Sequence, residues 1–175
     1  MIEVEKYLTC LINKLKLHFN SKLLYVGLQG SYLRGEATEN SDIDVMVVLN
    51  KLELNDLTDY RNIIHSIGNF DKSCGFICSK EDLKNWNPLE ICHLKHTTKD
   101  YYGILSDLLP TYTEIDIINF IKISISNLYH EICHRYIHST YDNNIASLPH
   151  SYKNVFFILQ NIYFIKRSSI TIKCS

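Results

Sequence analysis

Apolar residues recur at helical spacing near the start of the chain and gather into short runs further on. Over residues 3–19 the spacing predicts an amphipathic helix. The apolar runs at 23–28 and 42–49 are short and rich in strand-favouring residues, so each predicts a strand. The apolar stripe of the predicted helix consists of Val4, Leu8, Leu11, Ile12 and Leu15.

A second helix is predicted over residues 52–69, because apolar residues share one side and a glycine follows as a stop. The short run 74–78 predicts another strand, and the serine-capped segment 79–86 predicts one or two helical turns. This order of elements predicts a small mixed sheet flanked by helices. The apolar side of the second helix consists of Leu57, Tyr60, Ile64 and Ile67, with Gly68 as the stop.

The second half of the chain has a helical pattern and shows no further strand. Helical stretches are predicted at 88–95 and 99–108, and a long helix at 114–139 follows a capping box formed by Thr113 and Asp116. The apolar stripe of the long helix consists of Ile117, Ile121, Ile125, Leu128 and Ile132.

A polar loop at 139–150 then leads to a last predicted helix at 150–166. The change of pattern divides the chain. We therefore expect the α+β class, with a core of sheet and helices over residues 1–90 and an all-helical C-terminal region over residues 91–175.

The composition narrows the classes of function. The 175 residues are 46% hydrophobic and 21% charged, as in an ordinary soluble protein. A formal net charge of −1 provides no basic field, so we expect no nucleic-acid partner. No apolar run has the length of a membrane span, and the acidic N-terminus does not resemble a signal peptide. The six cysteines match neither a zinc ribbon nor a disulfide framework, so we expect a cytoplasmic protein without a membrane partner.

The stretch GSYLRGEATENSDIDVMVV, Gly30–Val48, carries the strongest chemical signal. Asp42 and Asp44 stand two apart at the start of a strand, so their carboxylates project from the same face. Two adjacent carboxylates repel each other unless a cation lies between them, and Mg²⁺ prefers such oxygen ligands. The glycine before Ser31 lets the backbone approach a ligand, and Ser31 is predicted to cap a short helix whose N–H groups bind phosphate. Taken alone, the two aspartates would indicate only a solvated strand end.

The order of these features resembles the signature of the DNA polymerase beta-like nucleotidyltransferase superfamily. The order is a strand, Gly-Ser, Arg-Gly, Ser-Asp-x-Asp and an apolar strand. The chain is most similar to small bacterial members: the kanamycin nucleotidyltransferase-like enzymes and the minimal nucleotidyltransferases paired with helical toxins. The resemblance implies transfer of AMP from ATP to a hydroxyl of a small-molecule or protein acceptor. Members of the family generally continue further, so we also expect the helical region to be truncated.

The resemblance assigns roles residue by residue. Asp42 and Asp44 would hold Mg²⁺, and the Gly30–Ser31 turn would hold the triphosphate. Arg34 would neutralise phosphate charge, unless it is an ordinary surface arginine. Ser41 would orient the first aspartate or cap the entry to the strand.

The resemblance also implies a third carboxylate on a later strand, at about Cys74, where the sequence has none. Asp71 could replace it as a metal ligand if the strand starts earlier or carries a bulge. Glu90 or Glu131 could reach in from the helical half, and the resemblance also makes Glu131 a candidate base on the acceptor hydroxyl. Loss of a base slows a reaction by roughly 10²- to 10⁴-fold, so we expect weak turnover or dependence on a partner. The alternative is an antitoxin-like or regulatory nucleotide-binding module with a helical partner protein or as a homodimer.

The segment HEICH, His130–His134, matches the H-E-x-x-H motif of zinc peptidases. Histidines four apart on a helix can share one zinc, with Glu131 as the base. His138 continues the same side but lies about 12 Å along the axis from the first histidine, too far to share that zinc. We favour a polar helix face, in which Glu131 and Arg135 form an (i, i+4) pair.

Overall fold

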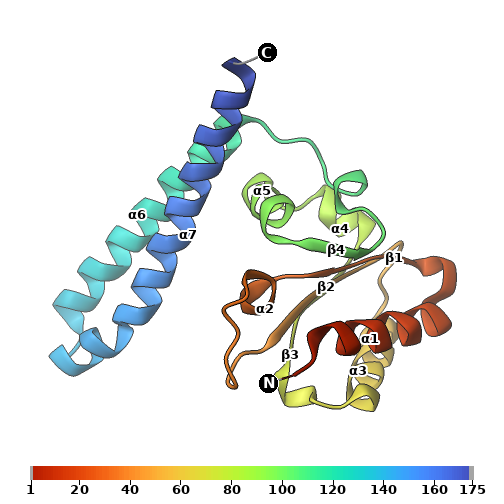
Figure 1. Ribbon diagram of the computed structural model, residues 1–175. Helices are drawn as coiled ribbons and strands as arrows, with labels where there is room; N and C mark the ends of the chain where they lie inside the picture. The colour runs from red at the N-terminus through yellow and green to blue at the C-terminus, as the bar shows by residue number, and fades with distance from the viewer. Residues whose placement is uncertain (1, 174–175) are drawn as a thin grey trace. The chain divides into compact units, whose positions relative to one another are not determined.

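The computed structural model describes residues 2–173, which fall into two compact units (Figure 1). Of these residues, the first unit comprises 2–87 and 94–110, and the second comprises 88–93 and 111–173. The first unit contains a sheet with helices and the second is helical, so the predicted α+β class is confirmed.

A four-stranded mixed sheet forms the centre of the first unit. The strands have the order β3-β2-β1-β4; β1 is antiparallel to both β2 and β4, and β2 is parallel to β3. The three predicted strands are confirmed to within a residue at each end. The bounds are β1 Leu23–Leu28, β2 Ile43–Leu49, β3 Ser73–Ser79 and β4 Lys99–Tyr102.

Two helices, α1 (Val4–Phe19) and α3 (Leu54–Ile67), cover one face of this sheet (Figure 1). Alternate residues of β2 from Ile43 to Leu49 point into this core, because side chains alternate along a strand. The remaining residues of β2, including Asp44, therefore project to the opposite face. The stripe predicted for α1 is confirmed at its centre, where Leu8, Leu11 and Leu15 are fully buried.

The predicted apolar side of α3 is confirmed at Tyr60 and Ile67, which pack against the core, and was wrong at Leu57. Ile63 is the buried apolar residue, whereas Leu57 is 42% exposed. Asp56, in the first turn of the helix, is also buried on this side. Lys22 Nζ donates to both carboxylate oxygens of Asp56, at 2.7 and 2.6 Å. The Glu53 N–H donates to the same carboxylate at 2.6 Å, which completes a capping box.

The fourth strand, β4, lies where we predicted a helix over 99–108, so that prediction was wrong. Residues 99–102 pair with β1, and a 3₁₀ turn, Leu105–Asp107, follows. The Tyr25 hydroxyl on β1 donates to Asp100 Oδ1 at 2.6 Å and fixes the new strand. The four-residue segment is too short for a periodicity, so tertiary pairing decided its conformation.

Short helices connect these elements. They are α2 (Gly30–Arg34), α4 (Lys80–Lys84), α5 (Pro88–Thr97) and two 3₁₀ turns, Asn20–Lys22 and Phe70–Lys72. The predicted serine cap of α4 is confirmed, because Ser79 Oγ accepts a hydrogen bond from the Asp82 N–H at 3.1 Å.

The second unit contains a hairpin of two long helices, α6 (Glu114–His138) and α7 (Tyr141–Lys173). The predicted capping box of α6 is confirmed, with the Asp116 N–H donating to Thr113 Oγ1 at 3.3 Å. The predicted stripe is confirmed at Ile117 and Ile121, which are buried against α7, and at Leu128, which packs against the same core. It was wrong at Ile125 and Ile132, which are 49% and 44% exposed.

The prediction of a loop at 139–150 was wrong, because α7 already begins at Tyr141 and continues through Pro149. The Asn143 N–H donates to Thr140 Oγ1, as at a helix N-cap. The polar residues after Thr140 suggested a loop, although Ser, Thr, Asn and Asp are also the residues that start helices.

Candidate functional site

Asp42 and Asp44 lie at the N-terminal end of β2, on the face of the sheet opposite α1 and α3. Asp44 is the second residue of the strand and is half-buried, whereas Asp42 is exposed and directly precedes the strand. Their common spacing places both carboxylates on the same face. The sheet therefore presents two negative charges at one corner.

Gly30 brings the backbone of α2 directly against this corner. It has a left-handed backbone with φ +71°, and a Cβ added there would lie 1.9 Å from Asp44 Oδ2. The Gln29 N–H also donates to the Asp44 carbonyl oxygen at 2.9 Å. Only glycine satisfies both the backbone angle and the close approach, so the glycine of the Gly-Ser turn positions the second aspartate.

The prediction that Ser31 caps α2 was wrong. The helix begins one residue earlier, at Gly30, and Gln29 is its N-cap residue. Ser31 is therefore the second residue of the helix and is half-buried. Its N–H belongs to the first turn, where backbone donors have no partner within the helix.

Cys74 lies beside Asp44, because β2 and β3 are parallel and these two residues are register partners. The residue is exposed overall, yet partial burial of the thiol raises its pKa. The neighbouring Asp44 and Asp42 carboxylates raise the pKa further, and the thiol hydrogen-bonds to Asp44. The thiol therefore stays protonated at neutral pH and cannot accept a proton.

Asp71 does not complete the site as a third carboxylate. It lies in the 3₁₀ turn before β3, which starts at Ser73 opposite Ile43, so the strand neither begins earlier nor reaches Asp71. Between residues 2 and 173, no group of three or more His, Cys, Asp or Glu side chains is arranged to hold a metal ion. The two aspartates are therefore not joined by a third acidic ligand in the described chain.

Arg34 and Ser41 have other partners in this structure. Arg34 Nε donates to Glu36 Oε2 at 2.7 Å, and both side chains are largely exposed. Ser41 Oγ accepts from the Thr38 N–H at 2.8 Å, so it closes the turn that leads into β2. This agrees with a role for Ser41 at the strand entry, and it gives Arg34 a competing ion pair.

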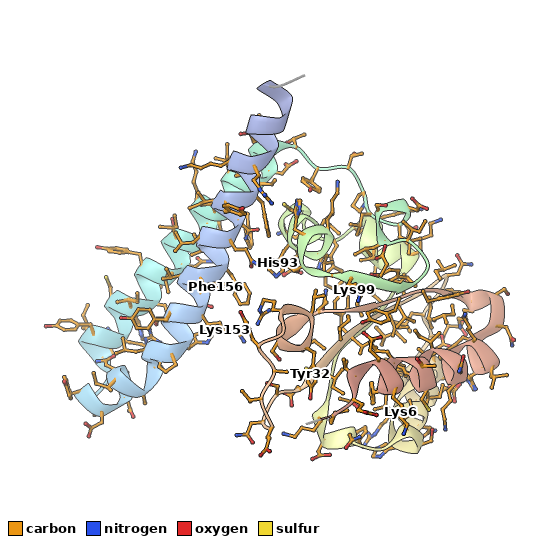
Figure 2. All side chains as sticks on the ribbon, viewed as in Figure 1. Lys6, Tyr32, His93, Lys99, Lys153 and Phe156 are labelled. Carbon is orange, nitrogen blue, oxygen red and sulfur yellow. The ribbon has the colours of Figure 1, made fainter. Side chains whose placement is uncertain are left out.

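From the sequence we did not identify Thr98 and Lys99, which lie next to β4 in the chain and at its start. Gln29, which precedes the glycine turn, donates from Nε2 to Thr98 Oγ1 at 2.8 Å. Lys99, the next residue, pairs with Leu28 at the end of β1, and its side chain is exposed (Figure 2). A cation thus stands at the same end of the sheet as the glycine turn. Because we predicted a helix over 99–108, we did not expect Lys99 to pair with β1.

Glu131 lies on α6 in the second unit. Its carboxylate forms the predicted (i, i+4) ion pair with Arg135, at 3.0 Å. His130 and His134 are neighbours on the same helix, with ring centroids 6.1 Å apart. The arginine occupies the carboxylate that a zinc peptidase would need as its base, which favours the polar-face interpretation of this segment.

Several solved structures are similar to this chain. A crystal structure of the spectinomycin adenyltransferase AAD(9) from Enterococcus faecialis, with ATP and spectinomycin, matches with a TM-score of 0.52 and 15% identity over 93% of this chain and 98% of that one. A toxin–antitoxin structure with AMP-PNP matches with a TM-score of 0.41 and 21% identity, over 73% and 91%. A structure of a mutant MntA–HpeT toxin–antitoxin matches with a TM-score of 0.42 and 20% identity, over 78% and 94%. No curated protein gave a match.

The fold and the aspartate pair beside a glycine turn define a nucleotidyltransferase-type α+β domain. The chain belongs to the nucleotidyltransferase domain family, whose model matches residues 12–132. The match includes the whole of β1, α2, β2 and β3, and therefore the entire candidate site.

Proposed function

We propose that this protein binds ATP together with Mg²⁺ and transfers AMP to the hydroxyl of an acceptor. The observation that carries the proposal is the packing of the Gly30 backbone against the Asp44 carboxylate. It brings together a glycine turn, which we propose binds phosphate, and two carboxylates, which we propose bind Mg²⁺. Membership of the nucleotidyltransferase family supports nucleotidyl transfer, and the adenyltransferase neighbour crystallised with ATP supports ATP as the nucleotide.

The side chains at this corner fit Mg²⁺ bound with a triphosphate. Mg²⁺ is commonly held by one or two carboxylates, with phosphate oxygens and waters as the other ligands. Asp42 and Asp44 would supply those carboxylates, and the bound ion would neutralise charge on the triphosphate. The N–H groups of Gly30 and Ser31 would hold the phosphates, and Arg34 would contribute charge after leaving Glu36. Ser41 keeps the loop before Asp42 in place.

A slow reaction follows from the same geometry. The register position next to Asp44 carries Cys74, whose raised pKa prevents it from taking the acceptor proton. Absence of a base costs roughly 10²- to 10⁴-fold in rate. Glu131, which we propose as the base, would first have to leave Arg135. We therefore expect the protein to bind the nucleotide but to transfer AMP only slowly.

The second candidate function is a nucleotide-binding module that acts through a protein partner. Cys74 in place of an acidic residue favours it, since such a module needs to bind the nucleotide but not to activate an acceptor. A cytoplasmic bacterial protein of either kind would encounter ATP, so both candidates share the same first test.

Titration calorimetry with ATP, with and without Mg²⁺, tests the site. We expect Asp42→Asn and Asp44→Asn each to weaken Mg²⁺-dependent ATP binding at least about tenfold, because even a neighbour of a metal ligand commonly contributes that much. Both residues are outside the apolar core, so the melting temperature should stay close to that of the unmodified protein.

Asp107→Asn, at an exposed position of the turn Leu105–Asp107, is the matched control and should bind ATP normally. If Asp42→Asn and Asp44→Asn bind ATP with Mg²⁺ as tightly as Asp107→Asn does, the two aspartates are not the metal ligands that we propose. Transfer itself is measured with α-labelled ATP, using spectinomycin and co-purifying proteins as acceptors. Binding without any transfer would favour the second candidate function.

A further inference from the structure

The first half of α7 turns polar residues towards α6 and leaves apolar residues exposed, whereas Ile158, Ile162 and Ile165 further along pack into the core of the hairpin. Ser151 is buried and accepts a hydrogen bond from the Arg135 guanidinium of α6, so this side of α7 faces its neighbour. A helix hairpin normally buries the apolar side of each helix. The inward side is at most half exposed and consists of Asn144, Ser147, Ser151, Asn154, Ile158, Asn161 and Ile165.

The outward side carries a regular apolar row, which we call the outer stripe. Its members follow one another at alternating intervals of four and three residues, which is the 3.5-residue repeat of a coiled coil. Their exposed fractions range from 37% for Val155 to 77% for Tyr141. The outer stripe consists of Tyr141, Ile145, Leu148, Tyr152, Val155 and Leu159. The next position of the repeat, Ile162, is half-buried and packs against the core of the hairpin.

The charges along α7 indicate the orientation of a partner helix. Asp142 stands at the start of the outer stripe, and Lys166 takes the next position of the repeat after Leu159 and Ile162. Between these ends only Lys153 carries a permanent charge. A helix that fits this row is therefore apolar in the middle, positive at the end near Asp142 and negative at the other end.

We propose that the outer stripe binds the same stripe of a second copy of this chain, in antiparallel orientation. One antiparallel register pairs Leu148 with Leu159 and Tyr152 with Val155. It brings Lys166 of each copy to the end that carries Asp142 of the other. A parallel pairing would instead place Lys166 against Lys166, which opposes association.

The symmetry of the row supports the second copy over an unrelated helix. A twofold interface requires that one patch be complementary to itself. The centre of the outer stripe meets this requirement, because Leu148 is matched with Leu159 and Tyr152 with Val155 about a point between Lys153 and Asn154. Asp142 then lies one residue from the position opposite Lys166. The inference concerns α7 alone and does not rest on the proposed nucleotide chemistry.

Light scattering during size-exclusion chromatography of the full chain tests the proposal. We expect a dimer, and we expect Tyr152→Glu to weaken the dimer at least about tenfold, because it puts a charge at the centre of the interface. Tyr152 is 70% exposed in the single chain, so the variant should keep its helical circular dichroism. Lys153→Glu, at the exposed neighbouring residue (Figure 2), is the matched control and should remain dimeric.

Charge reversal tests the antiparallel orientation. We expect Asp142→Lys and Lys166→Glu each to weaken the dimer roughly two- to fivefold, as surface ion pairs do. The double variant should recover the dimer, because it restores opposite charges at each end. A monomer, a dimer insensitive to Tyr152→Glu, or a double variant weaker than either single one would overturn the proposal. A complex with a different helical protein, formed by a chain that is monomeric alone, would also overturn it.

Discussion

Gly30 and Gly35, at the two ends of α2, have the same backbone angle and different surroundings. Both have φ +71°, but a Cβ at Gly30 would meet Asp44 Oδ2 at 1.9 Å, whereas one at Gly35 would meet no atom within 4 Å. Substitution by alanine at either position should therefore reduce the free energy of unfolding by about 1–2 kcal/mol, because a left-handed backbone is strained for alanine. Only Gly30→Ala should also displace the carboxylate and weaken Mg²⁺-dependent ATP binding, as titration calorimetry would measure.

The pair of variants separates backbone strain from site geometry. Equal losses of ATP affinity in Gly30→Ala and Gly35→Ala would mean that α2 acts as a whole. Normal affinity in both would show that the turn does not touch the nucleotide. The comparison needs only that both proteins melt at similar temperatures, which their shared backbone angle makes the expected result.

Cys74 offers a gain-of-function prediction at the scale of one side chain. Cys74→Asp puts a carboxylate beside Asp44, where the parallel register places the thiol. If the missing base limits the reaction, transfer of label from α-labelled ATP should rise by about 10²-fold. Three clustered carboxylates repel one another without a cation, so the melting temperature should fall without Mg²⁺ and recover with it.

Cys74→Ser is the control for this change, because serine has the size of the thiol but no charge. It should leave both the transfer rate and the response of the melting temperature to Mg²⁺ unchanged. If Cys74→Asp transfers label no faster than Cys74→Ser, the missing base is not the reason for slow turnover.

The residues of the site that lie close together in sequence could be predicted from sequence, and the others could not. Gly30, Asp42 and Asp44 stand within one motif whose spacing already implies a turn and a shared strand face. Gln29 joins Thr98 only because β4 returns to the sheet after a long detour. A hydrogen bond between such distant residues leaves no local pattern.

The capping box of α3 gives a prediction at the scale of an element. Burial disfavours ionised Asp56, but hydrogen bonds from Lys22 and from the Glu53 N–H outweigh it and lower its pKa. A lowered pKa contributes stability above the ordinary value of 3.8, and this contribution is lost as the pH falls through the lower folded value. Lys22→Met should therefore reduce the free energy of unfolding at pH 7 by about 1.5–3 kcal/mol.

Urea denaturation at pH 7 and at pH 3 measures this effect. The difference between Lys22→Met and the unmodified protein should be smaller at pH 3 than at pH 7, because below 3.8 the unfolded chain takes up a proton at Asp56 more readily than the folded chain. Lys51→Met, which breaks the exposed pair with Glu53, should have little effect at either pH. A difference that stays constant with pH would show that Lys22 stabilises α3 through packing alone.

Elements with strong periodicity were predicted well, and those decided by neighbours were not. The stripe of α1 and the capping box of α6 are local signals, and both appear in the structure. The start of α7 was hidden by polar residues and by Pro149, since an interior proline costs a helix about 3 kcal/mol or more. Packing of α7 along α6 is a tertiary contribution that the sequence pattern does not display.

At the scale of the whole molecule, the two units differ in how they use their apolar residues. The first unit buries them on both faces of the sheet, against α1 and α3 on one face and at Tyr25, Met46 and Val48 on the other. In the second unit, both α6 and α7 leave large apolar side chains exposed. Among the described residues, no helix has the length and apolar character needed to span a membrane. The exposed residues of the second unit are instead available for the protein contact proposed for α7.

The order of the strands has a consequence for how the protein folds. Leu28 pairs with Val45 on β2 and also with Lys99 on β4, so the second contact closes a far longer stretch of chain. Lengthening such a loop about fourfold costs roughly 1.2 kcal/mol of additional chain entropy. We therefore expect β4 to dock last, with its amides gaining protection after those of β2 in pulse-labelled hydrogen exchange. Simultaneous protection of the two strands would contradict this order.

The same order has a consequence during synthesis on the ribosome. The growing chain would hold its two aspartates in place before the Gln29–Thr98 hydrogen bond can form. It would acquire the complete site only after residue 102 has emerged.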